Sequence, residues 1–193
     1  MKVYVVRHGE AEGNQEGRYL GHIDSPLTEV GRQQALRQSE VLKGLGIARI
    51  LSSDLMRARA TASIIADAMG LPVLSTSALR EANHGVIDGC LASDIRKSEY
   101  GRARKKDKYN YRPPGGESCA DIEARVLSVL MPPPDQTSLL VTHLGPMRVM
   151  LHRLGGLSQG DAVGAKIGHE AILALTSTGA SWSGTFLNGS PGR

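Results

Sequence analysis

Cysteine is nearly absent from the sequence, with only Cys90 and Cys119 among 193 residues. Their separation fits no metal-ligand pattern, so no zinc-type site is expected. So little cysteine in a chain of this length is typical of a reducing compartment, and we expect a cytoplasmic protein. The fold then depends on its hydrophobic core, and a chain of this size buries about 70% of its unfolded surface without a disulfide or metal.

Long apolar runs are also missing. No stretch approaches the roughly 18 apolar residues of a membrane-spanning helix, so no membrane partner is expected. The N-terminal segment reaches Arg7 after too few apolar residues to be a secretory signal. Hydrophobic residues make up 40% and charged residues 22%, which excludes general disorder. The length predicts a single domain over residues 1–193.

Positive charge is concentrated in residues 96–112, which hold eight basic side chains against two acidic ones. Three tyrosines are interleaved with these charges. Such a segment can be a solvated surface excursion, a lid that draws a phosphorylated ligand towards a pocket, or a nucleic-acid surface. The solvated excursion is favoured, and nucleic acid is not the expected partner.

Short apolar runs alternate with helical patterns along the chain. Strands are expected at 2–6, 48–51, 71–74, 138–142 and 172–176, helices at 28–43, 54–69, from 118 and near 146, and a loose tail from about 179. Ser53 or Asp54 is expected to cap the second helix, and Ser118 with Asp121 resembles a capping box, to which Glu117 is also assigned. This alternation predicts an α/β fold, a three-layer sandwich whose mostly parallel central sheet has helices on both faces.

Polar residues follow three of the expected strands. Arg7 and His8 follow the first, Arg57 comes shortly after the second, and His143 follows the strand at 138–142. Because ligands of such sheets bind beyond the carboxyl ends of the strands, we expect these residues at one site. Arg57 falls in the first turn of its helix, where the helix dipole disfavours a cation unless an anion binds there. Guanidinium groups and helix-start amides together predict a phosphate or sulfate pocket.

Five blocks of the sequence resemble those of the histidine phosphatase superfamily, the phosphoglycerate mutase-like group. They cover about residues 3–150 in the family's order: Val6–Glu10 with Asn14 and 24–31, then 52–58, Leu79–Glu81 with Gly85 and Gly89, Pro114–Ser118, and Val141–His143. The Arg-His-Gly block alone is a weak signal, whereas all five in order are specific.

The resemblance implies a phosphatase that needs no metal and no cofactor. It implies that His8 attacks a phosphomonoester to give a phosphohistidine, that Arg7, Arg57 and His143 contact the phosphoryl oxygens, and that Glu81 protonates the leaving oxygen and then activates water. A neutral imidazole suits this role, since it is a nucleophile without first losing a proton. One ring nitrogen must stay free while the other is held by an acceptor, and a backbone carbonyl is expected.

Several further residues are assigned by the same resemblance. Asn14 and the amide of Leu144 are implied to assist phosphate binding. Leu20 stands where many family phosphatases have glutamine, Leu144 replaces a common glycine, and His84 replaces Tyr or Phe; we expect His84 to contact the organic part of the substrate. The other histidines, which have no strand-end position, are interpreted as surface or packing residues: His22, His152 and His169.

Two enzyme functions fit these blocks, and a phosphatase is favoured. It would hydrolyse a small phosphomonoester, in the manner of α-ribazole phosphatases or broad-specificity members. The alternative is a cofactor-dependent phosphoglycerate mutase, but the family's mutases usually carry a longer insertion before the Pro-Gly-Gly-Glu block. A module that binds phosphate without turnover is a third interpretation, disfavoured because binding alone needs neither a nucleophile nor an acid. A homo-oligomer is left open.

Overall fold

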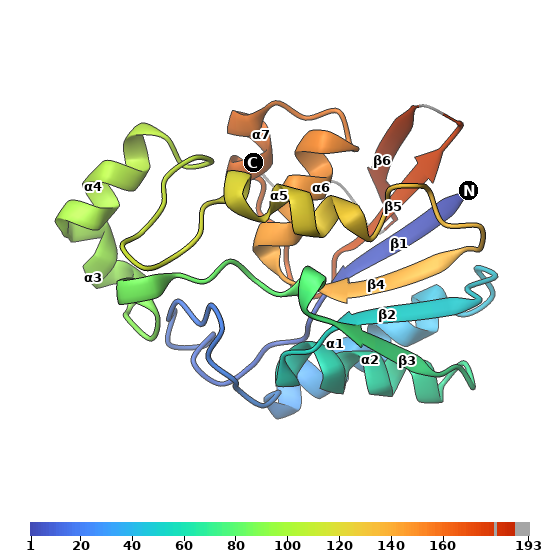
Figure 1. Cartoon of the computed structure of the whole chain (residues 1–193). Helices are drawn as coiled ribbons and strands as arrows, with labels where there is room; N and C mark the ends of the chain where they lie inside the picture. The colour runs from blue at the N-terminus through green and yellow to red at the C-terminus, as the bar shows by residue number, and fades with distance from the viewer. Residues whose placement is uncertain (180, 188–193) are drawn as a thin grey trace.

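The computed structural model describes residues 1–179 and 181–187. Its centre is a six-stranded sheet in the order β3-β2-β4-β1-β5-β6 (Figure 1). The strands are β1 (Lys2–Arg7), β2 (Arg49–Ser53), β3 (Val73–Thr76), β4 (Ser138–Thr142), β5 (Ile172–Ser177) and β6 (Trp182–Phe186). The first four strands are parallel, and β5 and β6 run antiparallel to their neighbours. The predicted mostly parallel sheet is confirmed.

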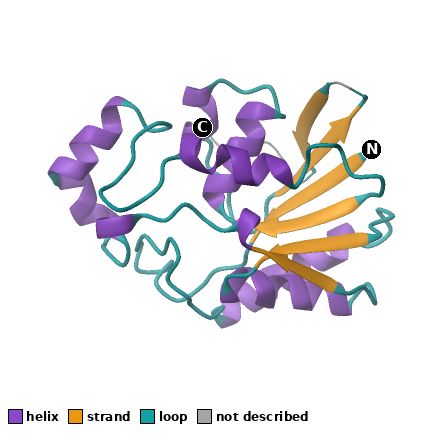
Figure 2. Cartoon of the chain, in the orientation of Figure 1, coloured by secondary structure: helices purple, strands orange, loops and turns teal. Residues whose placement is uncertain are grey.

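Helices cover both faces of this sheet (Figure 2). The helices are α1 (Glu29–Leu42), α2 (Met56–Asp67), α3 (Ala92–Lys97), α4 (Glu99–Lys106), α5 (Cys119–Ser128), α6 (Leu144–Arg153) and α7 (Gln159–Gly164), with 3-10 turns η1 (Ser77–Leu79) and η2 (Gly85–Ile87). Helices α1 and α2 lie on one face, whereas α5, α6 and α7 lie on the other (Figure 1). Helices α3 and α4 lie beyond the carboxyl ends of the parallel strands (Figure 1).

The first strand shows how this sandwich arises from the sequence. Val3 and Val5 pack into the core under α5 and α6, and Tyr4 and Val6 pack into the core under α1 and α2. Side chains of a strand alternate between its faces, so a run that is apolar throughout must be covered on both sides. The unbroken apolar run therefore places β1 in the interior of the sheet.

Two expectations about chain ends and helix starts are wrong. Part of the expected loose tail forms β6, which pairs with β5; residues 180 and 188–193 lie outside the described residues. The N-cap of α2 is Leu55, which has no side-chain cap, rather than Ser53 or Asp54. Asp54 pairs with Arg80 instead, at 2.6 Å, and so is not available to the helix.

Apart from Leu42, helix α1 packs through small and polar residues. Val30, Leu36 and Val41 are about half exposed, while Gly31 and Ala35 are buried. The reason is the close approach of α1 to the loop after β1. A Cβ atom on Gly31 would lie 2.0 Å from the carbonyl oxygen of Glu10, so only glycine allows this contact.

We predict that Gly31→Ala destabilises the protein by about 2 kcal/mol, because the added methyl group must push the loop after β1 away from α1. Urea unfolding measures the effect. Gly164→Ala, also in a helix but with nothing within 4 Å of the added atom, is the matched control and should not destabilise the protein. Equal stabilities for the two variants would contradict the close approach.

Candidate active site

The register of the parallel strands brings the two candidate histidines together. Arg7 pairs with Thr142 across β1 and β4, and the next residue of each strand is a histidine. The backbone N–H of His8 donates to the Thr142 carbonyl at 2.9 Å, and the ring centroids of His8 and His143 lie 4.9 Å apart. Both side chains are buried. The predicted clustering at the carboxyl ends of the strands is therefore observed.

The ring of His8 is held in one orientation. Its Nδ1–H donates to the carbonyl of Gly9 at 2.7 Å, so the acceptor is a backbone carbonyl, as expected. This tautomer leaves the lone pair on Nε2, towards which Arg57 Nε donates at 3.3 Å. Burial, with nearby cationic and imidazole groups, lowers the pKa of His8 well below its usual value. His8 is thus a neutral imidazole with a free nitrogen.

Arg57 lies in the first turn of α2 and is almost fully buried. Its guanidinium donates to the carbonyls of Gly21 and Ile23, each at 2.8 Å. No acidic residue of α2 lies in its first turn, so the positive charge of Arg57 adds to the positive end of the helix dipole, which Asp24 offsets in part by accepting from the N–H of Met56 at 2.8 Å. Burial lowers the pKa of Arg57 from its usual value. An anion beside it would offset both effects.

Arg7 and His143 each keep a buried nitrogen without a hydrogen-bond partner. Arg7 Nη1 donates to the carbonyl of Ile167 at 2.8 Å, but its Nε has no partner among the described residues. His143 Nε2 contacts Ser53 Oγ at 2.9 Å, and its Nδ1 is unpartnered in the same part of the chain. Burial lowers the pKa of Arg7 to about 10. Buried donors without partners are costly, which favours an anionic ligand at Arg7.

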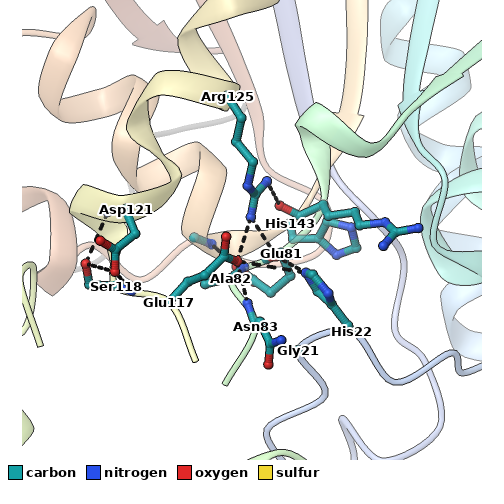
Figure 3. Close-up of polar contacts among 12 residues, drawn as sticks. Gly21, His22, Glu81, Ala82, Asn83, Glu117, Ser118, Asp121, Arg125 and His143 are labelled. Atoms are coloured by element: carbon teal, nitrogen blue, oxygen red, sulfur yellow. Dashed lines mark hydrogen bonds and ion pairs between the residues drawn. The ribbon is translucent and has the colours of Figure 1, made fainter. Parts of the chain in front are cut away.

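Glu81 lies in the loop after η1, and its carboxylate contacts the first turn of α6. Its carboxylate accepts from the N–H of Gly145 at 3.0 and 3.2 Å and from the N–H of Ala82 at 2.9 Å. The loop around it is fixed from behind: Arg125 donates to the carbonyls of Arg80 and Glu81 at 2.7 and 3.0 Å (Figure 3). The carboxyl group is therefore positioned before any ligand binds.

Two residues hold the backbone behind Glu81. His22 Nε2 lies 2.9 Å from the Glu81 carbonyl, a structural contact that fits its interpretation as a surface or packing residue (Figure 3). Glu117 takes no part in the capping box, which consists of Ser118 and Asp121 alone. Its carboxylate instead accepts from the N–H of Asn83 at 2.9 Å. Both side chains brace the loop that carries the candidate acid.

A cavity of about 390 Å³ opens in front of His8. Most of the predicted site residues line it: Arg7, His8, Asn14, Arg57, Glu81, His84 and Leu144. His143 lies behind His8 and outside the lining. Asn14 also holds the turn after β1, since its Oδ1 accepts from the N–H of Ala11 at 3.0 Å. The volume suits a small metabolite rather than a macromolecule.

The wall near His84 is aromatic. The ring of Tyr19 meets the ring of His84 edge-on at 5.1 Å, and the guanidinium of Arg104 lies over the Tyr19 ring, 5.7 Å from its centroid. Leu20 is buried beside them. These flat and apolar surfaces are suited to the organic part of a ligand.

His169 is a lining residue that the sequence interpretation missed. Its Nδ1–H donates to the carbonyl of His8 at 2.7 Å, and the two rings lie 5.4 Å apart. Burial lowers the pKa of His169 to about 4. No spacing signal marks it, because it follows a loop rather than a strand. His152, by contrast, packs edge-on against Tyr109, as expected of a packing residue.

Some residues of the basic segment at 96–112 line the cavity, and others are exposed to solvent. Arg104 and Lys108 line the cavity. Lys105 and Lys106 are exposed, and the exposed Arg112 pairs with Asp121. The segment is therefore partly a cavity wall and partly a solvated surface. No described helix is both long and apolar enough to cross a membrane, and no group of three potential metal ligands occurs in residues 1–179 and 181–187.

Comparison with known proteins agrees with this site. The chain matches the model of the family described as Histidine phosphatase superfamily (branch 1) over residues 3–189. A Salmonella paratyphi B protein named "Probable phosphoglycerate mutase GpmB" is 41% identical over 149 residues, covering 74% of this chain and 69% of that protein.

Solved structures are similar over almost the whole chain. A mycobacterial glucosyl-3-phosphoglycerate phosphatase, solved with VO3, is 29% identical with a TM-score of 0.86, covering 98% of this chain and 99% of that chain. The α-ribazole phosphatase of Shigella flexneri is 26% identical with a TM-score of 0.84, covering 100% and 99%.

We predict that the free energy of unfolding falls as the pH drops below about 6.5, the pKa of histidine in the unfolded chain. There the unfolded chain takes up protons on His8, His143 and His169, whereas burial keeps the folded groups neutral. Each contributes a loss of about 1.4 kcal/mol per pH unit. Urea unfolding at several pH values between about 7.5 and 5 measures the slope.

This interval separates the buried histidines from the carboxylates that are paired with arginine. The pKa values of Asp54 and Asp121 are lowered by Arg80 and Arg112, so their stabilising contribution is lost only below about pH 4. His143→Gln should reduce the pH dependence of the free energy of unfolding by about 1.4 kcal/mol per pH unit, even if the variant is less stable than the wild type. A free energy of unfolding that stays constant between about pH 7.5 and about pH 5 would contradict the neutral state of the buried histidines.

Proposed function

The chain belongs to the histidine phosphatase superfamily, branch 1, and is a phosphatase; on that basis we propose that it hydrolyses a small phosphorylated metabolite without a metal, through a phosphohistidine at His8. The observation that carries the proposal is the state of the His8 ring. It is neutral, oriented by Gly9 through Nδ1, and presents Nε2 to Arg57 at 3.3 Å.

The first step is in-line attack of His8 Nε2 on phosphorus. The bond from nitrogen to phosphorus forms as the ester bond breaks, and Glu81 gives its proton to the leaving oxygen. Arg7 and Arg57 interact with the equatorial oxygens, over which negative charge spreads in the transition state. The buried Arg57 and the unpartnered Nε of Arg7 are in place before the substrate enters, so little reorganisation is needed.

The second step returns the enzyme to its starting state. A water molecule attacks phosphorus as the bond to Nε2 breaks, and Glu81 takes the proton from that water. The carboxyl group is thereby protonated again for the next cycle. The amides of Gly145 and Ala82 hold its oxygens in the same position throughout.

A phosphoglycerate mutase is the second candidate, favoured by the relative at 41% identity that bears that name. The two functions share the first step and differ in what accepts the phosphoryl group. The structural neighbours named as phosphatases, and the short segment before Pro114, support hydrolysis. Transfer between 2- and 3-phosphoglycerate that depends on added bisphosphoglycerate would favour the mutase.

The substrate class follows from the cavity and the neighbours. The volume and the aromatic wall of Tyr19 and His84 fit a compact organic phosphate. An α-ribazole-phosphate-like or broad-specificity activity is consistent with the similar solved structures. A cytoplasmic location, an oligomeric state and the absence of nucleic-acid binding stay predictions from the sequence.

We predict that His8→Ala lowers the rate of phosphomonoester hydrolysis by at least about a thousandfold, because the nucleophile is lost. Quenched reactions of the wild type should contain an acid-labile phosphoryl group on His8, and those of the variant none. His152→Ala, which removes a histidine outside the cavity, is the control and should keep its activity. Normal turnover by the folded His8→Ala protein would contradict the proposal.

We predict that Glu81→Gln affects substrates according to their leaving groups. The kcat/KM value reports steps up to phosphoenzyme formation, so it isolates the protonation of the leaving oxygen. For alkyl phosphates it should fall by about 10² to 10⁴. For nitrophenyl phosphate, whose leaving group needs little protonation, the loss should be much smaller. Gln retains an oxygen for the Gly145 amide, so equal losses would remove Glu81 from the acid role.

A further inference from the structure

The peptide units on either side of His8 are each held at both ends. In the first unit, the N–H of His8 donates to the Thr142 carbonyl at 2.9 Å, and the carbonyl of Arg7 accepts from Gln38 Nε2 at 3.1 Å. Thr142 ends β4, and Gln38 lies in α1. A strand and a helix therefore fix the point at which the candidate nucleophile leaves the sheet.

The second peptide unit, between His8 and Gly9, is held by two side chains that take no part in the reaction described above. The carbonyl of His8 accepts from His169 Nδ1–H at 2.7 Å, and the N–H of Gly9 donates to Thr61 Oγ1 at 3.0 Å. Thr61 lies in α2, and His169 lies in the loop before β5. Because a peptide unit is planar, contacts at both ends determine its orientation.

The orientation of this unit matters because the next carbonyl is the acceptor for the ring of His8. The carbonyl of Gly9 accepts from His8 Nδ1–H at 2.7 Å. Glycine rotates about its backbone bonds more freely than any other residue. A more restricted residue does not fit here, since a Cβ atom on Gly9 would lie 2.2 Å from the carbonyl oxygen of Gly31. The rigidity that the ring requires must therefore come from contacts outside the segment.

His169 is itself fixed in the state that its contact with His8 needs. Its own carbonyl accepts from Gln38 Nε2 at 2.8 Å. Burial, together with the charge of Arg7, lowers the pKa of His169 to about 4, so the ring is neutral and carries a single proton. Because the carbonyl of His8 can only accept, that proton lies on Nδ1. A neutral ring also adds no further positive charge beside Arg7.

We propose that His169 and Thr61 are positioning residues for the nucleophile: by holding the peptide unit between His8 and Gly9 at both ends, they keep the Gly9 carbonyl on Nδ1 and direct His8 Nε2 at the phosphoryl group. This inference rests on the proposed function for the role of His8. Neither residue has to touch the reacting atoms. Thr61 is fully buried and lies outside the cavity lining in the part of the chain that the structure describes.

The expected benefit is in rate and not in binding. In-line attack requires Nε2 to lie about 3–3.5 Å from phosphorus and in good alignment, and a misplacement of about 1 Å costs roughly a hundredfold in rate. The phosphoryl group is bound by Arg7 and Arg57 in the proposed reaction. The guanidinium of Arg57 is held by the carbonyls of Gly21 and Ile23, which do not depend on the peptide unit after His8.

Paired variants separate each hydrogen bond from the space that its side chain fills. His169→Leu and Thr61→Val remove the donor and the acceptor, whereas His169→Asn and Thr61→Ser retain an N–H and a hydroxyl there. His152→Leu is the matched control. His152 Nδ1–H also donates to a backbone carbonyl, that of Leu157 at 2.9 Å, but outside the cavity lining of the described residues.

Nitrogen NMR of the His8 ring, assigned by comparison with His8→Ala, tests the orientation without any turnover. At about neutral pH the wild type should carry the ring proton on Nδ1 and none on Nε2. In His169→Leu and Thr61→Val we expect at least about a tenth of the molecules to carry it on Nε2. His169→Asn, Thr61→Ser and His152→Leu should give spectra close to that of the wild type.

Kinetics and binding give a second readout. The kcat value for a phosphomonoester should fall about 10- to 100-fold in His169→Leu and Thr61→Val, and should recover to within about threefold of the wild type in His169→Asn and Thr61→Ser. The Kd of inorganic phosphate, measured by calorimetry, should change by less than about twofold in all four variants. His152→Leu should match the wild type in both measurements.

Two results would overturn the positioning role. One is a ring tautomer and a kcat that stay as in the wild type in both His169→Leu and Thr61→Val. The other is a loss of phosphate affinity as large as the loss of kcat, without recovery in the Asn and Ser variants, which would indicate general disruption of the site. Either pair decides alone if one variant fails to fold. Failure of the proposed function is separate, since turnover and phosphohistidine would be absent in the wild type while the NMR differences remain.

Discussion

The parallel pairing of β1 with β4 is the constraint on which the site depends. It aligns Arg7 with Thr142, so that the residues after both strands, His8 and His143, leave the sheet side by side. A shift of the pairing by one residue would turn every side chain of β1 to the opposite face. Because β1 is apolar on both faces and buried between helices, it is held centrally in the sheet, and the alternation of its side chains fixes which of them face each core.

A second feature of the site is that its buried positive charges are not fully compensated by carboxylates. Arg57 lies at the positive end of α2, Arg7 keeps an unpartnered Nε, and the nearest candidate acid, Glu81, is held by amides at the start of α6 instead of by the arginines. Such an arrangement costs stability in the free protein. A bound phosphoryl group supplies the compensating negative charge, so relief of this destabilisation contributes to the binding free energy. A site whose function requires such charges is expected to lower stability.

The sequence predicts the site residues that follow the strands, but it does not predict that Arg148 and His169 line the cavity. Apolar runs mark the strands, and polar residues at their ends are brought together by the sheet, so Arg7, His8 and His143 are predictable. Arg148 lies within α6 and His169 follows a loop, and both look like ordinary surface residues in sequence. Their place in the cavity depends on how α6 and the loop before β5 pack, which is a tertiary property.

Local chemistry also misled the prediction in two elements. The glycine and serine residues of this segment suggested a loose tail, but residues Trp182–Phe186 form strand β6 because they pair with β5. Ser53 and Asp54 are good helix caps, but Asp54 forms an ion pair with Arg80 and the helix begins later. In both cases a long-range contact outweighs a local preference.

Helix α4 carries Arg104 to the cavity although none of its residues is buried. Its attachment is the close contact with α3, where a Cβ atom on Gly101 would lie 2.1 Å from the carbonyl oxygen of Ile95. An element with so little apolar contact opens locally at a small free-energy cost, well below that of global unfolding. Ligand that engages Arg104 must therefore draw part of its binding energy into ordering α4, and amide hydrogen exchange in this helix becomes a readout of occupancy at a distance from the chemistry.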